Sequence, residues 1–324
     1  MTESKTVASP LGDGRPAGVG NRGDRVWNAT LLGFGGAILV LAGLIVVILL
    51  RSSQPLFAQV GFLQFLKGTA WNPVTDAFGA LPFIYGTLVT SAVAIVLAVP
   101  VALGLALFST QLAPRPLAPL ITVPVELLAA IPSVVYGLWG LFVMVPFLRT
   151  HVEPFLQARF GFLPLFQGPP IGLGYLAGGV ILAIMILPTV SAVATEVIKT
   201  VPVAQTEAAL ALGATRWEAI RLAVLPYSRK GILGAVLLGL GRALGETMAV
   251  TMVIGNSPSI SASLFAPGYS LPSVIANEFS EATTATHVGA LTALALILFG
   301  LTLLLNAAAR LLMRATAGKT IKGT

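Results

Sequence analysis

Two opposite charges stand inside a long apolar run of the sequence. Arg242 and Glu246 lie in the segment 239–255, GLGRALGETMAVTMVIG, whose other residues are apolar, glycine or threonine. A charge near the centre of a membrane helix costs at least about 2.5–3.5 kcal/mol on insertion scales. The two residues are four positions apart, so on one helix they share a face and can pair. Such charges indicate a solute pathway, and an ion pair that only fixes packing is the alternative.

The chemistry that Arg242 would offer is the binding of an oxyanion. Its planar guanidinium donates two parallel hydrogen bonds to such a group. An arginine paired with a glutamate would hold an anion weakly, which suits a pathway that the solute must also leave. Thr247, beside Glu246, is assigned to the same pathway. Glu126 is a further candidate, and the alternative is that it bonds the backbone freed by the neighbouring prolines.

The composition is that of an integral membrane protein. Of the 324 residues, 56% are hydrophobic and 10% are charged, and the mean hydropathy is +0.91. Soluble domains carry roughly 25% charged residues. The chain has no cysteine, which excludes disulfides and thiolate chemistry. Its two histidines, His151 and His287, are far apart, so no metal site is expected, and the scattered acids predict no catalytic site.

Six apolar segments are long enough to cross a bilayer, and we expect an all-α fold with six transmembrane helices. Proline is tolerated inside membrane helices, so we expect Pro124, Pro132 and Pro146 to kink the third segment without dividing it. The polar stretch 1–27 is expected to be disordered. No cleavage pattern follows the first apolar run, which is therefore expected to be a retained helix. The six segments are roughly 29–50, 84–110, 117–148, 175–199, 231–255 and 287–313.

The basic residues predict the orientation. Lysine and arginine gather in the two terminal segments and in the loops after the second and fourth apolar segments. Cytoplasmic loops carry this excess, so both termini are expected to be cytoplasmic. The net charge of +7 is explained by this topology, and no nucleic-acid partner is expected. The outer loops 51–83, 149–174 and 256–286 are rich in glycine, proline and aromatic residues and are expected to form an extracytoplasmic docking surface.

The cytoplasmic loop at 200–231 predicts two short helices. Strong helix formers fill 207–212, and Gly213 stands where a helix usually ends. Thr215 and Glu218 have the spacing of a capping box, which predicts a second helix start. Pro226 is expected to end that second helix. An amphipathic helix lying on the membrane surface is the alternative interpretation of the loop.

The residues of this loop resemble the EAA loop of binding-protein-dependent ABC importer permeases. Ala223 stands where the family pattern has isoleucine, which affects only packing at that point. The resemblance implies a type I importer permease fold and a loop that fits into a cleft of a cytoplasmic ATPase subunit. There it would carry ATP-driven motion into the membrane. The residues that match the pattern in identity and spacing are Glu207, Ala208, Ala209, Gly213, Leu225 and Pro226.

Three further segments, 86–114, 126–146 and 238–256, resemble the phosphate-specific ABC importer permeases of the PstC type. The related PstA type shares the R-A-x-G-E core, but the flanking residues here look like PstC. With the loop, the resemblance covers most of the chain from about 80 to 313. It implies that Arg242 and Glu246 belong to a phosphate pathway. It also implies a PstA-like permease partner, a PstB-like ATPase dimer and a PstS-like extracytoplasmic phosphate-binding protein.

The expected organisation follows from these segments. A tail (1–27) precedes the first transmembrane helix and its outer loop (28–83). The core permease domain (84–313) contains the coupling loop at 200–226, and a cytoplasmic tail (314–324) follows. The expected location is the bacterial plasma (inner) membrane, in contact with membrane lipid. Gly241 and Gly245 form a small-xxx-small pair and predict close packing of the fifth span, with a second permease chain as one partner.

ATP is not expected to bind this chain. The C-terminal AGKT (317–320) suggests a nucleotide-binding loop, but that loop needs a glycine where Met313 stands. ATP and magnesium are therefore expected only on the partner ATPase. Two rival functions stay open from the sequence: a permease for molybdate or sulfate, and a secondary transporter. The latter predicts repeated halves, for which no convincing internal repeat is found.

Overall fold

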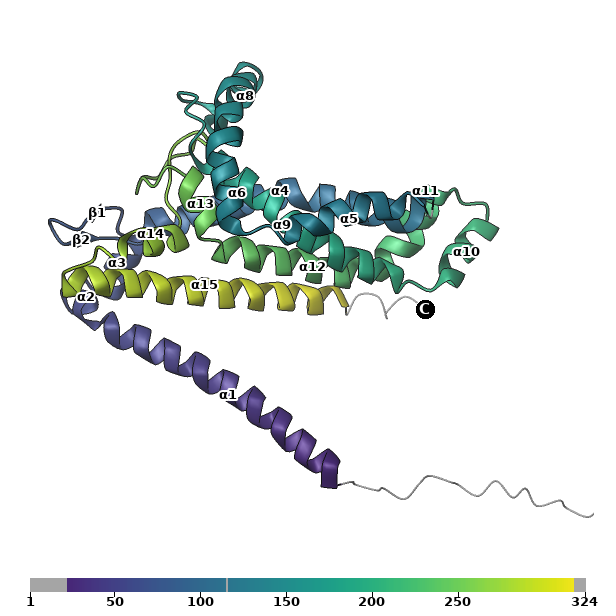
Figure 1. Ribbon diagram of the computed structural model, residues 1–324, viewed down its shortest axis with the longest axis horizontal. Coiled ribbons are helices and arrows are strands. Elements are labelled where there is room, and N and C mark those ends of the chain that lie inside the picture. Colours follow the sequence, from purple (N-terminus) through teal and green to yellow (C-terminus); the bar gives the residue numbers. More distant parts are fainter. Residues whose placement is uncertain (1–21, 115, 318–324) are drawn as a thin grey trace, which may run out of the picture. The chain divides into compact units, whose positions relative to one another are not determined.

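The computed structural model describes residues 22–114 and 116–317, which are almost entirely helical (Figure 1). Contacts divide the chain into a unit up to Ile48 and a unit from Leu49 onward, and the second holds every candidate site. A two-stranded antiparallel hairpin pairs β1 (Trp71–Asn72) with β2 (Ala77–Phe78). The helices are α1 (Arg22–Ser52), α2 (Gln54–Gln59), α3 (Phe62–Lys67), α4 (Leu81–Leu107), α5 (Ala118–Ala129), α6 (Ser133–Trp139), α7 (Val145–Phe147), α8 (Glu153–Phe160), α9 (Tyr175–Lys199), α10 (Val203–Ala211), α11 (Arg216–Ala219), α12 (Leu225–Gly245), α13 (Met248–Val253), α14 (Leu271–Glu278) and α15 (Ala285–Ala317).

Within the described residues, six helices are long and apolar enough to cross a membrane. The fourth, at Tyr175–Lys199, has the predicted bounds 175–199. The first begins at Arg22, inside the stretch that the sequence assigns to a disordered tail, and residues 1–21 lie outside the described part. The all-α membrane fold is confirmed.

The centre of the second unit is the packing of α4 against α9. Alanines recur every fourth residue on α4, at Ala94, Ala98, Ala102 and Ala106, and all are buried. Small side chains on one face let two membrane helices approach closely. A side chain at Gly179 of α9 would overlap Val93 of α4, because a Cβ there would lie 2.3 Å from the valine Cγ1.

The third apolar segment is divided, contrary to the prediction of a single kinked span over 117–148. α5 passes through Pro124 and ends at Ala129, and Pro132 then caps the start of α6 with an extended backbone, ψ 142°. The Tyr136 hydroxyl donates to the Leu128 carbonyl at 2.7 Å, and this carbonyl also accepts from the Ile131 nitrogen at 3.3 Å. The membrane-length helix runs instead from Ser133 to Phe160, into the expected outer loop.

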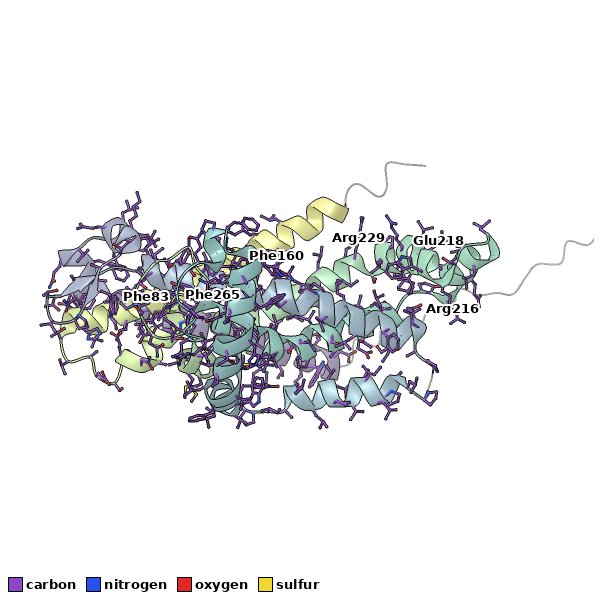
Figure 2. The ribbon with its side chains drawn as sticks, turned by 90° about the horizontal axis from the view of Figure 1, so that it is seen from above. Phe83, Phe160, Arg216, Glu218, Arg229 and Phe265 are labelled. Carbon is purple, nitrogen blue, oxygen red and sulfur yellow. The ribbon has the colours of Figure 1, made fainter. Side chains whose placement is uncertain are left out.

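This Ser133–Phe160 helix has two π-helical turns, Gly140–Met144 and Leu148–Val152, between α6, α7 and α8. Figures 1 and 2 show that it runs crosswise to α4, α9, α12 and α15, which lie side by side. Its residues join α9 and α13 in one buried cluster that includes Tyr136, Met144 and Val253.

The two ends of the second unit differ in content. α2, α3, the hairpin and α14 lie at one end, and α10 and α11 lie at the other (Figure 1). In Figure 2, Phe83 and Phe265 lie toward the first end and Arg216, Glu218 and Arg229 toward the second. The predicted outer loops and the predicted coupling loop are therefore at opposite ends of the bundle.

Candidate functional site

The first site element is a break in the helix that carries Arg242. α12 ends at Gly245, Glu246 has an extended backbone (ψ 126°), and α13 begins at Met248. The membrane-length helix of this region runs from Arg216 to Gly245, not from 231 to 255. The prediction that Arg242 lies at the centre of a continuous span is therefore wrong, because it lies in the last turn of α12.

The predicted i,i+4 pair between Arg242 and Glu246 does not form, because Glu246 lies outside the helix. Arg242 Nη1 donates weakly to Thr189 Oγ1 of α9 at 3.4 Å, and it has no acidic partner among the residues that the structure describes. Glu246 Oε1 instead accepts from the backbone nitrogen of Ala249 at 3.4 Å. The glutamate thus serves the start of α13, where backbone N–H groups favour a negative charge.

These contacts leave the Arg242 guanidinium available for an anion. The side chain is exposed on the surface of this chain, beside the half-buried Thr189 and Thr247. The unsatisfied carbonyls and the dipole at the end of α12 stabilise a cation in this turn. Thr247 has a local role, since its hydroxyl donates to the Gly245 carbonyl at 3.3 Å. The arrangement presents a cation with free donors at a helix break.

The two breaks are brought together by α6 and α13. A Cβ at Gly137 of α6 would lie 2.5 Å from Met252 Sδ and 3.2 Å from Ala249 Cα of α13. A larger residue there would require Met252 to move and the two helices that start after the breaks to separate by a few tenths of an ångström. Non-helical backbone at membrane depth is tolerated where it lines a cavity or is buried in protein. The breaks at 130–132 and 246–247 therefore mark the place where this chain can line a pathway.

Glu126 lies on α5 and faces a different neighbour from the one expected. It lines a cavity of about 130 Å³ between α5 and α9, together with Ser191, Thr195 and Lys199. It makes no hydrogen bond to the backbone within the described ranges, so the alternative based on the prolines is not observed. Arg242 does not line this cavity.

The second site element is the predicted coupling loop, which has two short helices. α10 ends in a Schellman motif: the Gly213 nitrogen donates to the Leu210 carbonyl (2.9 Å) and the Ala214 nitrogen to the Ala209 carbonyl (3.2 Å). Gly213 has φ +87°, in the region that favours glycine. The predicted role of Gly213 as a helix stop is confirmed.

The predicted capping box is also confirmed. The Thr215 backbone nitrogen donates to Glu218 Oε2 at 2.7 Å, and the Glu218 nitrogen donates to Thr215 Oγ1 at 3.3 Å. α11 therefore begins at a fixed point after the Schellman turn. The two motifs together hold the angle between α10 and α11.

The prediction that Pro226 ends the second helix is wrong. A π-helical turn, Ile220–Val224, follows α11, and the Leu225 nitrogen donates to the Ile220 carbonyl five residues earlier. Pro226 is the second residue of α12, and the wider π-helical turn before it accommodates the missing N–H. The helix is continuous from Arg216 into the membrane-length segment, so the loop is joined to α12 without a hinge.

The coupling loop exposes apolar side chains. Glu207 and Ala208 are exposed on α10 and Ala209 is half-buried. Near them, large apolar residues are uncovered at Val203, Leu212, Trp217 and Leu222. Apolar side chains grouped in this way mark an interaction surface.

The predicted packing role of Gly241 and Gly245 has no partner within the described chain. A Cβ at either position would meet no atom within 4 Å. The close approach of α12 to α9 uses other glycines, because a Cβ at Gly231 or Gly239 would lie 2.4–2.5 Å from a valine of α9. Packing of Gly241 and Gly245 against a second chain stays a prediction.

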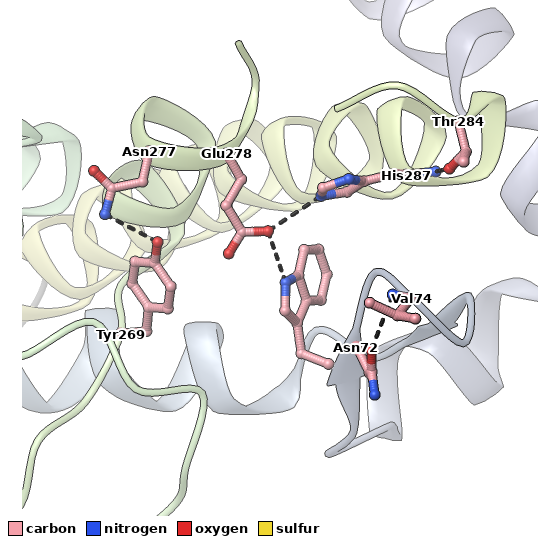
Figure 3. Close-up of polar contacts among 8 residues, drawn as sticks. Asn72, Val74, Tyr269, Asn277, Glu278, Thr284 and His287 are labelled. Carbon is pink, nitrogen blue, oxygen red and sulfur yellow. Dashed lines mark hydrogen bonds and ion pairs between the residues drawn. The ribbon is translucent and has the colours of Figure 1, made fainter. Parts of the chain in front are cut away.

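The opposite end holds a polar cluster that the sequence reasoning missed (Figure 3). Glu278 Oε2 accepts from Trp71 Nε1 at 2.9 Å and lies 3.1 Å from His287 Nε2. His287 is buried and stacks on Phe78. The cluster ties the hairpin to α14 and α15. Trp71 and Glu278 are 207 positions apart in the sequence, so no local pattern could indicate their contact.

A second contact fixes α14 nearby. Asn277 Nδ2 donates to the Tyr269 hydroxyl at 3.0 Å (Figure 3). Burial raises the pKa of Tyr269 to about 12, so the phenol stays protonated at neutral pH. The segment before α14 is therefore held by a neutral hydrogen bond beside the Glu278 carboxylate.

Solved structures share this fold. One is the alginate ABC transporter in complex with a periplasmic protein bound to alginate pentasaccharide: TM-score 0.59 and 17% identity, with 90% of this chain and 96% of that chain covered. Another is the inward-facing MetNI methionine ABC transporter, with TM-score 0.51, 18% identity and coverage of 73% and 94%. The chain thus shares its fold with solved ABC transporters.

The family follows from the sequence comparisons. The model of the binding-protein-dependent transport system inner membrane component matches residues 98–318, and the chain belongs to this family. A phosphate transport system permease protein PstC of Mesorhizobium japonicum is 50% identical over 299 residues, covering 91% of each chain. PstC of Pasteurella multocida is 45% identical over 280 residues, covering 85% of this chain and 87% of the relative. PstC 2 of Mycobacterium tuberculosis is 40% identical over 319 residues, covering 96% of each.

Proposed function

We propose that the chain is the transmembrane permease subunit of an ATP-driven importer of inorganic phosphate. The observation that carries the proposal is the available cation at the helix break, in a chain whose relatives at 40–50% identity are named phosphate transport permeases. A phosphate oxyanion takes two parallel hydrogen bonds from one guanidinium. Arg242 is exposed on this chain alone, so the pathway is completed by a second permease.

The partners follow from the two ends of the bundle. A PstA-like permease covers the exposed face of α12 and supplies the other half of the pathway. A PstB-like ATPase dimer binds the exposed apolar residues of the coupling loop. A PstS-like phosphate-binding protein docks at the hairpin and α14. ATP and magnesium bind the ATPase, and this chain holds no cofactor. Both termini and the coupling loop lie on the cytoplasmic side.

The mechanism is alternating access. Closure of the ATPase dimer moves α10 and α11 as one piece, because the Schellman motif and the capping box fix their angle. α11 continues into α12 without a hinge, so the movement reaches Gly245 and displaces Arg242 relative to Thr189. The guanidinium contacts phosphate while the pathway is closed to the outside, and the solute is released as α12 returns.

The test is phosphate uptake by the reconstituted complex that carries Arg242→Gln, with Arg25→Gln, at an exposed position of α1, as the matched control. We expect uptake to fall by roughly 10- to 100-fold, the loss of one charge-assisted contact. Assembly and ATPase activity should stay intact. The control should transport at the normal rate. Sulfate and molybdate as competitors establish which oxyanion is carried.

Normal uptake by Arg242→Gln in an assembled complex would contradict the pathway role. Glu246→Gln separates the pathway from packing, because the amide oxygen still accepts from Ala249. If Glu246 only caps α13, this variant should keep at least half of the uptake. If it touches the solute, uptake should fall with Arg242→Gln.

A further inference from the structure

The cavity between α5 and α9 has an arrangement of donors that the pathway at Arg242 does not use. Ser191, Thr195 and Lys199 are spaced four residues apart on α9, so they form one line on a single helix face. All three line the cavity, and Glu126 of α5 lines it too. The volume of about 130 Å³ is several times the ~30 Å³ that one water molecule takes up in the liquid.

The two hydroxyls of this line have no partner within the described ranges. Helix hydroxyls in this chain commonly donate to the carbonyl four residues earlier, as Thr87 and Thr122 do. Ser191 and Thr195 do not, although their side chains are 7% and 8% exposed. Neither hydroxyl is among the polar atoms sealed off without a partner, so both open into the cavity, and a ligand there can accept a hydrogen bond from each.

Lys199 adds the charge at the end of the line. Its ammonium is paired with Glu196 Oε1 at 2.8 Å, and both side chains are more than half exposed. An exposed ion pair of this kind contributes only about 0–1 kcal/mol, so a phosphate ion can displace the glutamate at little cost. The pair therefore leaves Lys199 available when an anion enters.

Glu126 selects among anions. A carboxylate only accepts hydrogen bonds when it is ionised. Hydrogen phosphate carries a hydroxyl that can donate to it, whereas sulfate and a lipid phosphodiester carry none at neutral pH. Glu126 and Glu196 both line the cavity. The hydroxyl of hydrogen phosphate can donate to Glu126, whereas sulfate and a phosphodiester would meet these carboxylates with no proton to bridge them.

We propose that this cavity is a second phosphate station on the cytoplasmic side of Arg242, in which Ser191, Thr195 and Lys199 donate and Glu126 accepts the hydroxyl of hydrogen phosphate. The proposal rests on the proposed function of the chain. α9 links the two stations, since Thr189 contacts Arg242 and Lys199 lies ten residues further along the same helix. At 1.5 Å per residue this is about 15 Å.

The test is binding of radiolabelled inorganic phosphate to the assembled complex without its binding protein, in phosphatidylcholine nanodiscs. Thr195→Val keeps the shape of the side chain and removes the hydroxyl, and Ser191→Ala removes the second one. We expect the double variant to lose binding roughly tenfold. Thr195→Ser should bind like the parent. Thr302→Val, whose hydroxyl donates to its own helix at Leu298, is the matched control.

The carboxylate is tested by competition. In the parent complex, sulfate should compete poorly with labelled phosphate. Glu126→Gln offers a donor in place of the acceptor, so sulfate should compete at least tenfold better in this variant. Lys199→Gln should weaken both anions, and Lys230→Gln is the matched lysine control outside the cavity.

The outcomes separate this proposal from the proposed function. Unchanged phosphate binding in the Ser191→Ala, Thr195→Val double variant would overturn the second station. If Arg242→Gln then still lost uptake, the proposed function would stand alone. If both variants transported normally, the phosphate pathway of this chain would itself be wrong. Displacement of phosphate by added phosphatidylglycerol, abolished in Lys199→Gln, would assign the cavity to a lipid headgroup and overturn the proposal.

Discussion

The coupling loop and the outer cluster are two ends of one bundle that are built by different means. At the loop, backbone groups form hydrogen bonds with residues three to five positions away. Gly213 and the Thr215–Glu218 capping box set the geometry. At the outer end, Glu278 joins Trp71 and His287, which come from separate parts of the chain. One end is fixed locally and exposes its apolar residues, whereas the other is fixed at long range around the buried His287 and Phe78.

This difference fits two kinds of contact. A surface that receives force from a separate subunit must keep its shape when the rest of the bundle moves, and local hydrogen bonds provide this independence. A surface assembled from the hairpin, α14 and α15 changes shape only if those elements move together. Movement of the bundle would therefore alter the outer end and leave the loop intact.

The largest expected effect is at the outer end. Glu278→Ala leaves the Trp71 N–H and the His287 ring without their acceptor and should lower the free energy of unfolding by about 2–3 kcal/mol. The measurement is thermal unfolding of the purified permease in one detergent. Glu281→Ala, at a nearby exposed acid, is the control. An equal shift in both variants would show that the cluster does not hold this end.

The second effect tests the loop through its backbone. Gly213→Ala forces a side chain into the left-handed region and should cost about 1–2 kcal/mol, confined to α10 and its turn. Hydrogen exchange of residues 203–219 should rise while α15 stays protected. Gly104→Ala, at an open helical glycine outside that region, should be neutral or stabilising. Faster exchange throughout the bundle would break the distinction between the two ends.

The third effect is smaller and concerns the capping box. Thr215→Ala should cost about 1 kcal/mol of local stability, and Thr215→Ser should retain most of it. Because the box fixes the start of α11, the Ala variant should also lower transport per ATP hydrolysed in the complex. Transport per ATP equal to that of the parent would show that the angle between α10 and α11 does not matter for coupling.

The smallest effect on the chain itself is expected for Trp217→Ala. The side chain is 60% exposed, so stability should change by no more than about 0.5 kcal/mol. Binding of the ATPase subunit should nevertheless weaken, because an exposed aromatic group is a common centre of an interface. Phe162→Ala, an exposed aromatic at a distance from the loop, is the control. If Trp217→Ala destabilised the permease but left ATPase binding normal, Trp217 would be a residue that stabilises the fold and not one that binds the ATPase.

The sequence predicts what short-range physics determines. The helix stop at Gly213, the capping box and the bounds of α9 follow from residues a few positions apart. The effects of the prolines are only partly predictable. Pro132 divides a segment, whereas Pro124 lies inside α5 and a π-helical turn precedes Pro226 in a continuous helix. A proline excludes one hydrogen bond, and the neighbouring turn decides how the helix responds.

The candidate site shows the same limit. Arg242 and Glu246 indicate a polar site in the membrane. Their hydrogen-bond partners, however, depend on the helix break after Gly245, which no residue pattern predicts. Gly245 lowers helix propensity by roughly 1 kcal/mol, which permits the break without requiring it. The contacts of Arg242 with Thr189, and of Glu246 with Ala249, follow only from the packing of α12, α13 and α9.

The unfilled surface beside Gly241 and Gly245 has a practical consequence. The chain contains no cysteine, so a single cysteine placed at either glycine would be its only thiol. Apart from its own stretch of helix, no atom of the described residues lies within 4 Å of a Cβ there, so that thiol would react freely with a small maleimide in the isolated permease. A second helix seated on the same face would shield it. A fall in the rate of labelling would then report that the second subunit has bound to this face of α12.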